Sequence, residues 1–330
     1  FAWFTSPAFR HEKYTGVVAG QNKVDLNVYY DPRDSVLWSK AGVYAARALE
    51  FYSDWLRAYP YQQMSVVSAP LSAGGGMEYP MVAQIGYMED SASLDLVIAH
   101  EIGHTWLYGI LANNERAHPW MDEGLNSFIE AQYTAKYQPA YREAYLPREY
   151  TTRASMDQVD ALQHALHFSN TLQPPATSPE SQQQAQYFFS AYTMPAQGLQ
   201  MMMGMEGEEV MKKMFRQYFA DHQFSHVTPA HLSNSFEQAC DCDLSWYFDG
   251  WIHHAHEIDY RISHFDREKK EGTFVNHGPA DIPLRFNTYK DGQQIREHTL
   301  NGFKGEKTIH LDHRADEIHL YEGFMGVNRH

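Results

Sequence analysis

The sequence predicts an α+β fold, because its pattern changes twice along 330 residues. Residues up to about 140 combine the alternation typical of strands with the spacing typical of amphipathic helices. Helical spacing dominates from about 141 to 258, and short alternating runs follow. We therefore expect three regions, at 1–140, 141–258 and 259–330.

The first region opens with strands and a helix. Alternation predicts strands at 24–30 and 64–68, and an amphipathic pattern between them predicts one long helix at 35–58. Gly74-Gly75-Gly76 then precedes Glu78. Because glycine has no side chain, another peptide backbone can approach closely, so we expect an edge strand that binds an extended peptide.

The next two helices carry the pattern that most limits the function. Asp90 or Ser91 can cap a helix that contains His100-Glu101-Ile102-Gly103-His104. Residues four apart lie on one face of a helix, so both imidazoles can bind one metal ion. A second helix is predicted at 120–137, with Glu123 in its first turn. Two histidines and a carboxylate bind catalytic Zn²⁺ and leave a fourth position open for water.

Glu101 lies beside this ligand face without being a ligand. It is suited to take a proton from the attacking water and to deliver one to the leaving amine. The alternative is a helix with ordinary buried or surface histidines. A glutamate at the required later position makes a chance match much rarer. The sequence therefore predicts one zinc ion, bound by His100, His104 and Glu123.

Several separate segments resemble the gluzincins of the aminopeptidase N family, which includes leukotriene hydrolase. The segment Gly75-Gly76-Met77-Glu78-Tyr79 resembles the family's Gly-x-Met-Glu-Asn motif, with Tyr79 in place of Asn. Trp120-Met121-Asp122-Glu123-Gly124 resembles its third-ligand segment, with Asp122 where Asn is common. The segment at 191–199 resembles the one that carries its catalytic tyrosine, here Tyr192, although Met194-Pro195 replaces the usual Lys-Gly.

The resemblance implies a thermolysin-like zinc domain with a helical second lobe, often followed by a small β domain. It implies that Glu78 binds the α-ammonium group of a peptide and that Gly75, Gly76 and Met77 line the substrate site. Tyr192 would donate a hydrogen bond to the oxyanion that forms during hydrolysis. Without this context, a glycine turn with a solvated glutamate would be the better interpretation.

The last region predicts a small antiparallel β-sandwich. Five alternating runs indicate strands, at 273–276, 282–289, 294–300, 308–311 and 317–321. Asp291-Gly292 predicts a hairpin turn. Earlier in the chain, a proline-rich loop is expected at 173–179, and the methionines of a helix at 199–205 are expected to fill a core.

The remaining histidines and cysteines predict no second site. The histidines within 253–256 are too close together to face one ion on a helix, and His164 and His167 lack an acidic helper. Cys240 and Cys242 are separated by one residue, which argues against a structural disulfide.

The composition excludes several classes of protein. A net charge of −15 argues against a nucleic-acid partner, because phosphates require clustered Lys and Arg. No apolar run approaches the length of a membrane span, and Phe1–Thr5 lacks the features of a signal peptide. Because family members carry a β-rich domain ahead of the catalytic one, we expect a fragment, and its localisation and oligomeric state stay unknown.

The sequence thus predicts a zinc-dependent aminopeptidase. It would hydrolyse the N-terminal bond of peptides with a free amino end, through a water that zinc and Glu101 activate. The nearest alternative is a thermolysin-type endopeptidase that cuts blocked peptides internally. A non-catalytic peptide-binding relative is a further alternative, although a structural zinc site has no use for a base such as Glu101.

Overall fold

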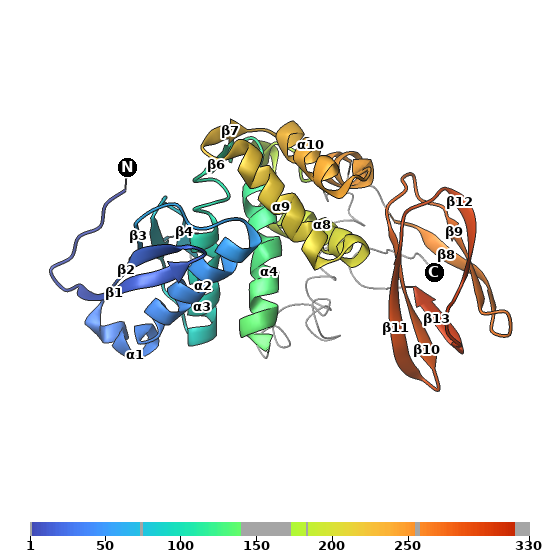
Figure 1. Ribbon diagram of the computed structural model, residues 1–330, viewed down its shortest axis with the longest axis horizontal. Coiled ribbons are helices and arrows are strands. Elements are labelled where there is room, and N and C mark those ends of the chain that lie inside the picture. The colour runs from blue at the N-terminus through green and yellow to red at the C-terminus, as the bar shows by residue number, and fades with distance from the viewer. Residues whose placement is uncertain (1, 73–74, 140–172, 183, 255–257, 321–330) are drawn as a thin grey trace. The chain divides into compact units, whose positions relative to one another are not determined.

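The computed structural model describes residues 2–72, 75–139, 173–182, 184–254 and 258–320 (Figure 1). The chain forms two compact units. The first consists of Phe1–Arg142 and Lys212–Cys240, and the second of Glu143–Met211 and Asp241–His330. Both mix helices with strands, as the α+β prediction requires.

A five-stranded sheet forms the base of the first unit, in the order β1-β2-β3-β5-β4. The strands are β1 (Arg10–Ala19), β2 (Asn22–Tyr30), β3 (Gln63–Ser68), β4 (Gly76–Met77) and β5 (Val82–Ile85). The three strands β2, β3 and β5 are parallel, whereas β1 and β4 are antiparallel to their neighbours. β4 therefore lies at an edge of the sheet.

The predicted strands at 24–30 and 64–68 are confirmed as β2 and β3. In β2, buried side chains alternate with less buried ones, as expected for a strand with one face on a core. β1 was not predicted, because most of its side chains are exposed and it pairs with one neighbour at the sheet edge.

The single long helix predicted at 35–58 is wrong in its extent. A short 3-10 turn and helix α1 (Ser35–Trp38) precede helix α2 (Ala41–Trp55). The Ser39 hydroxyl donates to the carbonyl of Val36 at 2.8 Å, which competes with helical pairing. Trp38 is buried and stacks on Tyr30, with ring centroids 5.9 Å apart, so it anchors α1 to the sheet.

Helices α2 and α3 (Ser91–Gly103) pack against the sheet and against each other (Figure 1). The Asp90 side chain accepts hydrogen bonds from the amides of Ala92 and Ser93, which confirms the predicted cap. After β6 (Leu111–Asn113), a π-helical segment (Trp120–Gly124) leads into α4 (Leu125–Tyr137). The second predicted helix is thus confirmed, with an irregular first turn.

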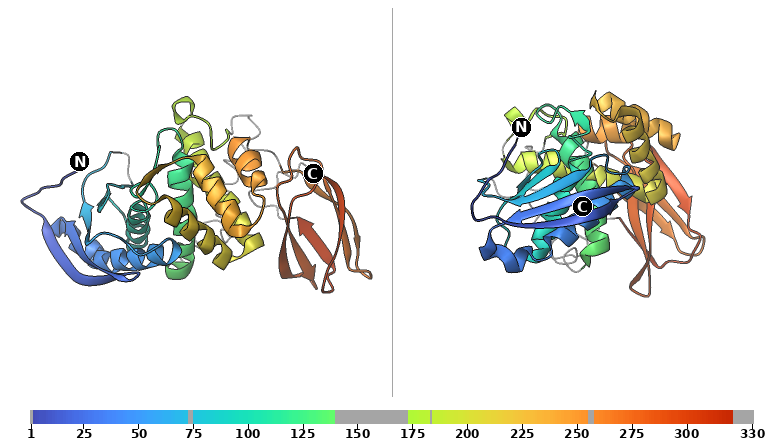
Figure 2. Two further views of the ribbon diagram at one scale, coloured as in Figure 1. Left: turned by 45° about the horizontal axis from the view of Figure 1, so that its top comes forward. Right: turned by 60° about the vertical axis from the view of Figure 1, so that its left-hand side comes forward.

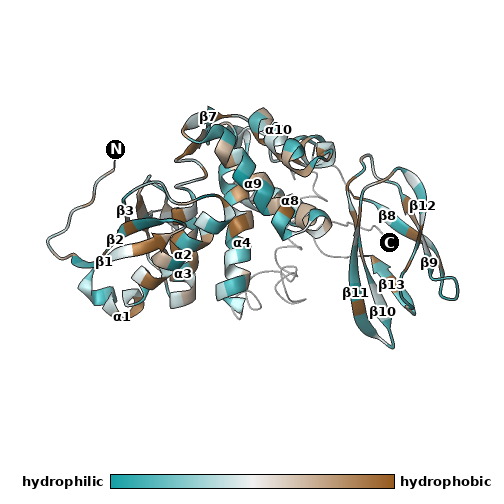
Figure 3. Cartoon of the chain, in the orientation of Figure 1, coloured by the Kyte–Doolittle hydropathy of each residue, from teal (hydrophilic) through white to brown (hydrophobic). Residues whose placement is uncertain are grey.

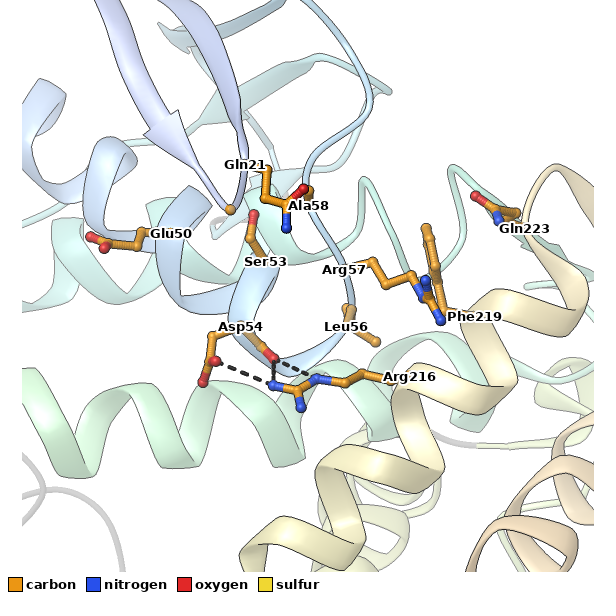
Figure 4. Close-up of a pocket in the computed structure, with 11 residues that line it drawn as sticks. Gln21, Glu50, Ser53, Asp54, Leu56, Arg57, Ala58, Arg216, Phe219 and Gln223 are labelled. Carbon is orange, nitrogen blue, oxygen red and sulfur yellow. Dashed lines mark hydrogen bonds and ion pairs between the residues drawn. The ribbon is translucent and has the colours of Figure 1, made fainter.

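The first unit is completed by α9 (Glu208–His222), β7 (Ser225–Val227) and α10 (Pro229–Cys240), with β7 parallel to β6. In Figure 3 these helices carry apolar and polar residues side by side, as expected where one face is buried. Lys212 and Arg216 of α9 form ion pairs with Asp54 of α2. Beside this contact lies a cavity of about 650 Å³ (Figure 4). None of its lining residues belongs to the metal-binding motif.

The second unit contains α7 (Gln184–Phe188), a π-helical segment (Phe189–Thr193), α8 (Met194–Glu206) and a further π-helical segment (Trp246–His253). The loop expected at 173–179 lies outside regular helices and strands. Met201 and Met202 of α8 are buried, which confirms the core prediction for these two, whereas Met203 and Met205 are only partly buried.

The last 60 or so described residues form two three-stranded sheets, β11-β10-β13 and β12-β9-β8, drawn orange to red in Figure 2. Their strands are β8 (Tyr260–Asp266), β9 (Glu271–Asn276), β10 (Leu284–Lys290), β11 (Gln293–Leu300), β12 (Gly305–His310) and β13 (Glu317–Leu320). All five predicted strands are confirmed, and β8 was missed. Asp291 and Gly292 both have positive φ, as the predicted hairpin turn requires.

The prediction for the two cysteines is also wrong. Cys240 and Cys242, the two cysteines of the chain, are disulfide-bonded despite the single residue between them. The chain leaves helix α10 at Cys240, and Asp241 has a positive φ of 56°, so the turn folds back on itself. Sequence spacing alone did not reveal this turn.

Several predictions fall on residues outside the described ranges. They include His164, His167, His256 and the helical pattern at 141–172. Among the described residues, no helix is long and apolar enough to cross a membrane.

Candidate metal centre

Helix α3 brings the two histidines of the motif together, and the turn before α4 adds Glu123. The Nε2 atoms of His100 and His104 lie 3.0 Å apart. Glu123 Oε2 lies 3.1 Å from the first and 3.2 Å from the second. Ligands on a tetrahedral zinc ion lie about 3.3 Å from one another, given bonds of about 2.0 Å. The structure thus brings together all three predicted ligands in a group that could hold a metal ion.

A carboxylate binds the outer nitrogen of each histidine. Glu130 Oε2 lies 2.9 Å from His100 Nδ1, and Asp122 Oδ1 lies 2.7 Å from His104 Nδ1. Such partners fix the ring orientation and leave Nε2 for a metal. Sequence reasoning missed Glu130, although its place seven residues after Glu123 puts both on one helical face.

Charges in this group are strongly coupled. Burial by itself lowers the pKa of His100, but hydrogen bonds with Glu123 and Glu130 raise it to about 10. Burial raises the pKa of Glu123, yet the two histidines outweigh it and hold that pKa below its usual range. The carboxylates therefore favour positive charge at the imidazoles. A cation bound here competes with protons for the same nitrogen atoms.

Glu101 lies between the metal-binding group and strand β4. Its side chain is 6% exposed, and its Oε2 atom is buried without a hydrogen-bond partner among the described residues. Burial raises the pKa of Glu101 to about 7, with His100 and His104 opposing the shift. A carboxylate whose pKa lies near neutrality is well matched to general base and acid chemistry.

A buried hydrogen-bond chain holds the two ligand helices together. Asn126 of α4 donates to the carbonyl oxygen of His100 at 2.8 Å and accepts from the Tyr52 hydroxyl at 2.7 Å. Gly103 permits this approach, because a Cβ atom there would lie 2.1 Å from Asn126 Oδ1. The positions of His100 and Glu123 thus depend on close packing of α2, α3 and α4.

Residues Gly75, Gly76, Met77 and Glu78 lie at the sheet edge. Gly76 and Met77 form β4, which confirms the expected edge strand in a short form. Gly75 has a positive φ of 68°, and its carbonyl accepts from the Gly86 amide at 2.8 Å. Glu78 follows β4 directly.

Two further carboxylates lie near Glu78. Oxygen atoms of Glu78, Glu115 and Asp122 all lie within 4.8 Å of one another. Glu115 was not singled out from the sequence, because a lone acidic residue in a connecting loop carries no signal of its own. Burial raises the pKa of Glu115, and the charge of Glu78 raises it further.

Tyr192 belongs to the second compact unit, whereas the three ligands, Glu101 and Glu78 belong to the first. It lies in the π-helical segment before α8, and its ring stacks on Phe188 with centroids 5.4 Å apart. Its catalytic role stays a prediction.

Residues 43–251 match the Peptidase family M1 domain. The chain belongs to this family. The predicted resemblance to the aminopeptidase N family is thereby confirmed.

Among curated M1 relatives, aminopeptidase N of Lactobacillus helveticus is 22% identical over 222 residues, which cover 63% of this chain and 26% of the relative. Aminopeptidase N of Rattus norvegicus is 24% identical over 268 residues, covering 73% of this chain and 27% of the relative. The chain therefore aligns with about a quarter of the length of these proteins.

Two solved structures share the fold. Aminopeptidase A of Legionella pneumophila, solved with aspartic acid, has a TM-score of 0.69 at 15% identity, covering 92% of this chain and 36% of that one. An M1 zinc metallopeptidase of Deinococcus radiodurans has a TM-score of 0.56 at 16% identity, covering 74% and 51%. These similarities establish the mixed helix-and-sheet fold of M1 enzymes.

Proposed function

We propose that this protein is a zinc-dependent aminopeptidase that releases the first residue of peptides with a free amino end. The observation that carries the proposal is the short path from Glu78 to the metal-binding group. A carboxylate oxygen of Glu78 lies within 4.8 Å of a carboxylate oxygen of Asp122, and Asp122 in turn binds His104. An anchor for a substrate amine thus lies close to a group suited to hydrolysis.

His100, His104 and Glu123 would hold the zinc ion, since two imidazoles and one carboxylate are the donor set of catalytic zinc sites. The buried, unpartnered Oε2 of Glu101 fits a site at which water belongs beside the metal. When bound, zinc lowers the pKa of water and polarises a carbonyl group.

Glu101 would act as the base and then as the acid. With a pKa of about 7, the ionised carboxylate is available near neutral pH to take a proton from attacking water. The same group then delivers a proton to the leaving amine. Such a role typically contributes about 10²–10⁴-fold to the rate.

Glu78 would bind the α-ammonium group and so place the first peptide bond beside Glu101. Gly75, Gly76 and Met77 would bind the substrate backbone along the edge of the sheet, because an edge strand can accept one more strand. Tyr192 would donate a hydrogen bond to the developing oxyanion, a contribution of about 3 kcal/mol.

The finer architecture also belongs to the proposal. We infer a thermolysin-like zinc domain at 1–140, a helical lobe at 141–258 and a small β-sandwich at 259–330. The two three-stranded sheets around a shared core of Tyr260, Phe274 and Phe286 support the last of these.

The test compares a short peptide that has a free amino end with its N-acetylated twin, each with and without a chelator. We expect release of the first residue from the free peptide only, and loss of this release with chelator. Equal internal cleavage of both peptides would assign the protein to the endopeptidases instead. If neither peptide were cut by zinc-loaded protein, the chain would not be an enzyme by itself.

A further inference from the structure

We propose that Glu115 is a second carboxylate that binds the substrate's α-ammonium group, opposite Glu78. This inference rests on the proposed aminopeptidase function and extends it to a residue outside the Gly-Gly-Met-Glu segment. It assigns to the β6–α4 connection a part in selecting peptides with a free amino end.

The spacing of the oxygen atoms fits one ammonium group. An ammonium donates its hydrogen bonds at tetrahedral angles, and charge-assisted N–H···O contacts are about 2.8 Å long. Two acceptors on one ammonium therefore lie about 4.6 Å apart. The oxygens of Glu78 and Glu115 lie within 4.8 Å of each other, inside the range that a single nitrogen can bridge.

Asp122, the third member of the group, has a different partner. It is 2% exposed, and its Oδ1 lies 2.7 Å from His104 Nδ1. Because that contact already engages Asp122 with a metal ligand, Glu78 and Glu115 are the two carboxylates of the group that remain to receive the ammonium. A lysine at the first position of a substrate carries its side-chain ammonium several ångströms from its α-ammonium. The two glutamates therefore cannot bind both ammonium groups at once.

An independent observation indicates that a ligand belongs here. Glu101 is only 6% exposed, and its Oε2 has no hydrogen-bond partner among the described residues. Its side chain lies against Gly76, two residues before Glu78. Buried oxygen atoms are rarely left unpaired, so a polar ligand is expected between Glu101 and Glu78.

The charge balance points to a cation at the amine end of that ligand. Desolvation and the charges of Glu78 and Glu123 act against ionised Glu115, while His104 and Arg116 favour it. An ammonium placed between the two glutamates would relieve this repulsion. A neutral amide, as in an acetylated peptide, would not.

The experiment measures peptide binding by calorimetry to zinc-loaded Glu101→Gln protein, in which turnover is suppressed. The ligands are Leu-Gly-Gly, Arg-Gly-Gly and N-acetyl-Leu-Gly-Gly. We expect Glu115→Gln to weaken both free peptides about 10- to 100-fold and to leave the acetylated peptide unchanged. Glu115→Asp should recover part of the affinity, and matched thermal unfolding would show that the variants are folded.

Glu50→Gln is the matched control, because it removes the same charge from an exposed position on α2, away from the metal-binding group. It should leave all three affinities unchanged. Loss confined to Arg-Gly-Gly would show that Glu115 binds a cationic side chain and would overturn the proposal. An unchanged affinity for the free peptides would do the same.

Two further outcomes have distinct meanings. The protein that retains Glu115 could bind two zinc ions while the Glu115→Gln variant binds one. The group of Glu78, Glu115 and Asp122 would then be a metal site, which contradicts the proposed amine site. If the parent bound free and acetylated peptides equally, the aminopeptidase function itself would fail, and this inference with it. If only the proposed role of Glu115 were wrong, the protein that retains Glu115 would still prefer free peptides to acetylated ones. The two failures are therefore distinguishable.

Discussion

Gly76 lies in direct contact with Glu101. A Cβ atom on Gly76 would come within 2.4 Å of Glu101 Cγ and 2.5 Å of its Oε1, distances that real side chains do not adopt. The edge strand thus lies so close to the proposed base that no side chain fits between them at Gly76. This glycine is required by close approach, because no positive φ is recorded for it.

Replacing Gly76 with Ala should displace Glu101 or the edge strand. We expect kcat to fall by about 10²-fold or more, as when a general base is misplaced, while zinc affinity stays within a few-fold of the original. Steady-state kinetics together with zinc titration would test this. Gly204→Ala is the control, because its nearest neighbour is the end of the Thr299 side chain at 3.3 Å. Normal turnover by Gly76→Ala would contradict the contact.

Asp122 should determine zinc affinity through His104. Asp122→Ala removes the partner of His104 Nδ1 at 2.7 Å, and loss of such a partner weakens metal binding by about 10- to 100-fold. Asp122→Asn keeps an oxygen acceptor and should cost less. Competition against a zinc-binding dye would rank the variants. Equal affinities for all three proteins would show that this carboxylate does not orient the ligand.

Asp95 should be important for stability rather than for the metal. It is fully buried and binds the Arg47 guanidinium, the Gln138 amide and the Tyr133 hydroxyl, the last at 2.7 Å. Asp95→Ala leaves a partly buried Arg47 without its carboxylate, which should cost about 3–5 kcal/mol in unfolding free energy.

Urea unfolding with Asp54→Ala as the control would check this. Asp54 also pairs with cations, but its side chain is 57% exposed, and such pairs contribute about 0–1 kcal/mol. Similar losses for the two variants would mean that burial of the Asp95 pair has no special effect.

Acid should destabilise the second unit through His298. Burial lowers the pKa of His298 below 6.5, and His313 and Arg296 lower it further, against Asp312. Its ring stacks on Phe286 with centroids 4.5 Å apart. The unfolded chain takes up the proton first, so stability present above pH 6.5 falls as the pH decreases towards the lower folded-state pKa.

Thermal unfolding at about pH 7.5 and about pH 5.5 would measure this loss. His298→Gln should reduce the difference between the two melting temperatures. His264→Gln, which changes an exposed histidine of the same unit, should not. Identical pH dependence in the original protein and in His298→Gln would rule out His298 as a source.

Local patterns predicted the elements that have a strong period or cap. The alternation of β2, the Asp90 cap of α3 and the Asp291-Gly292 turn all follow from interactions within a few residues. The break at Ser39 and the Cys240–Cys242 disulfide were missed, because each depends on a single turn whose backbone angles no periodic pattern encodes.

The sequence by itself predicted the three residues that meet in a group able to hold a metal ion. Helical spacing places His100 and His104 on one face, and the family resemblance identifies Glu123 as the third ligand and Glu78 as the expected amine anchor. Only the tertiary structure decided which groups surround them. Glu130, Asp122 and Glu115 meet the histidines and Glu78 because α3, α4 and the β6–α4 connection pack together, and such long-range contacts have no fixed spacing along the chain.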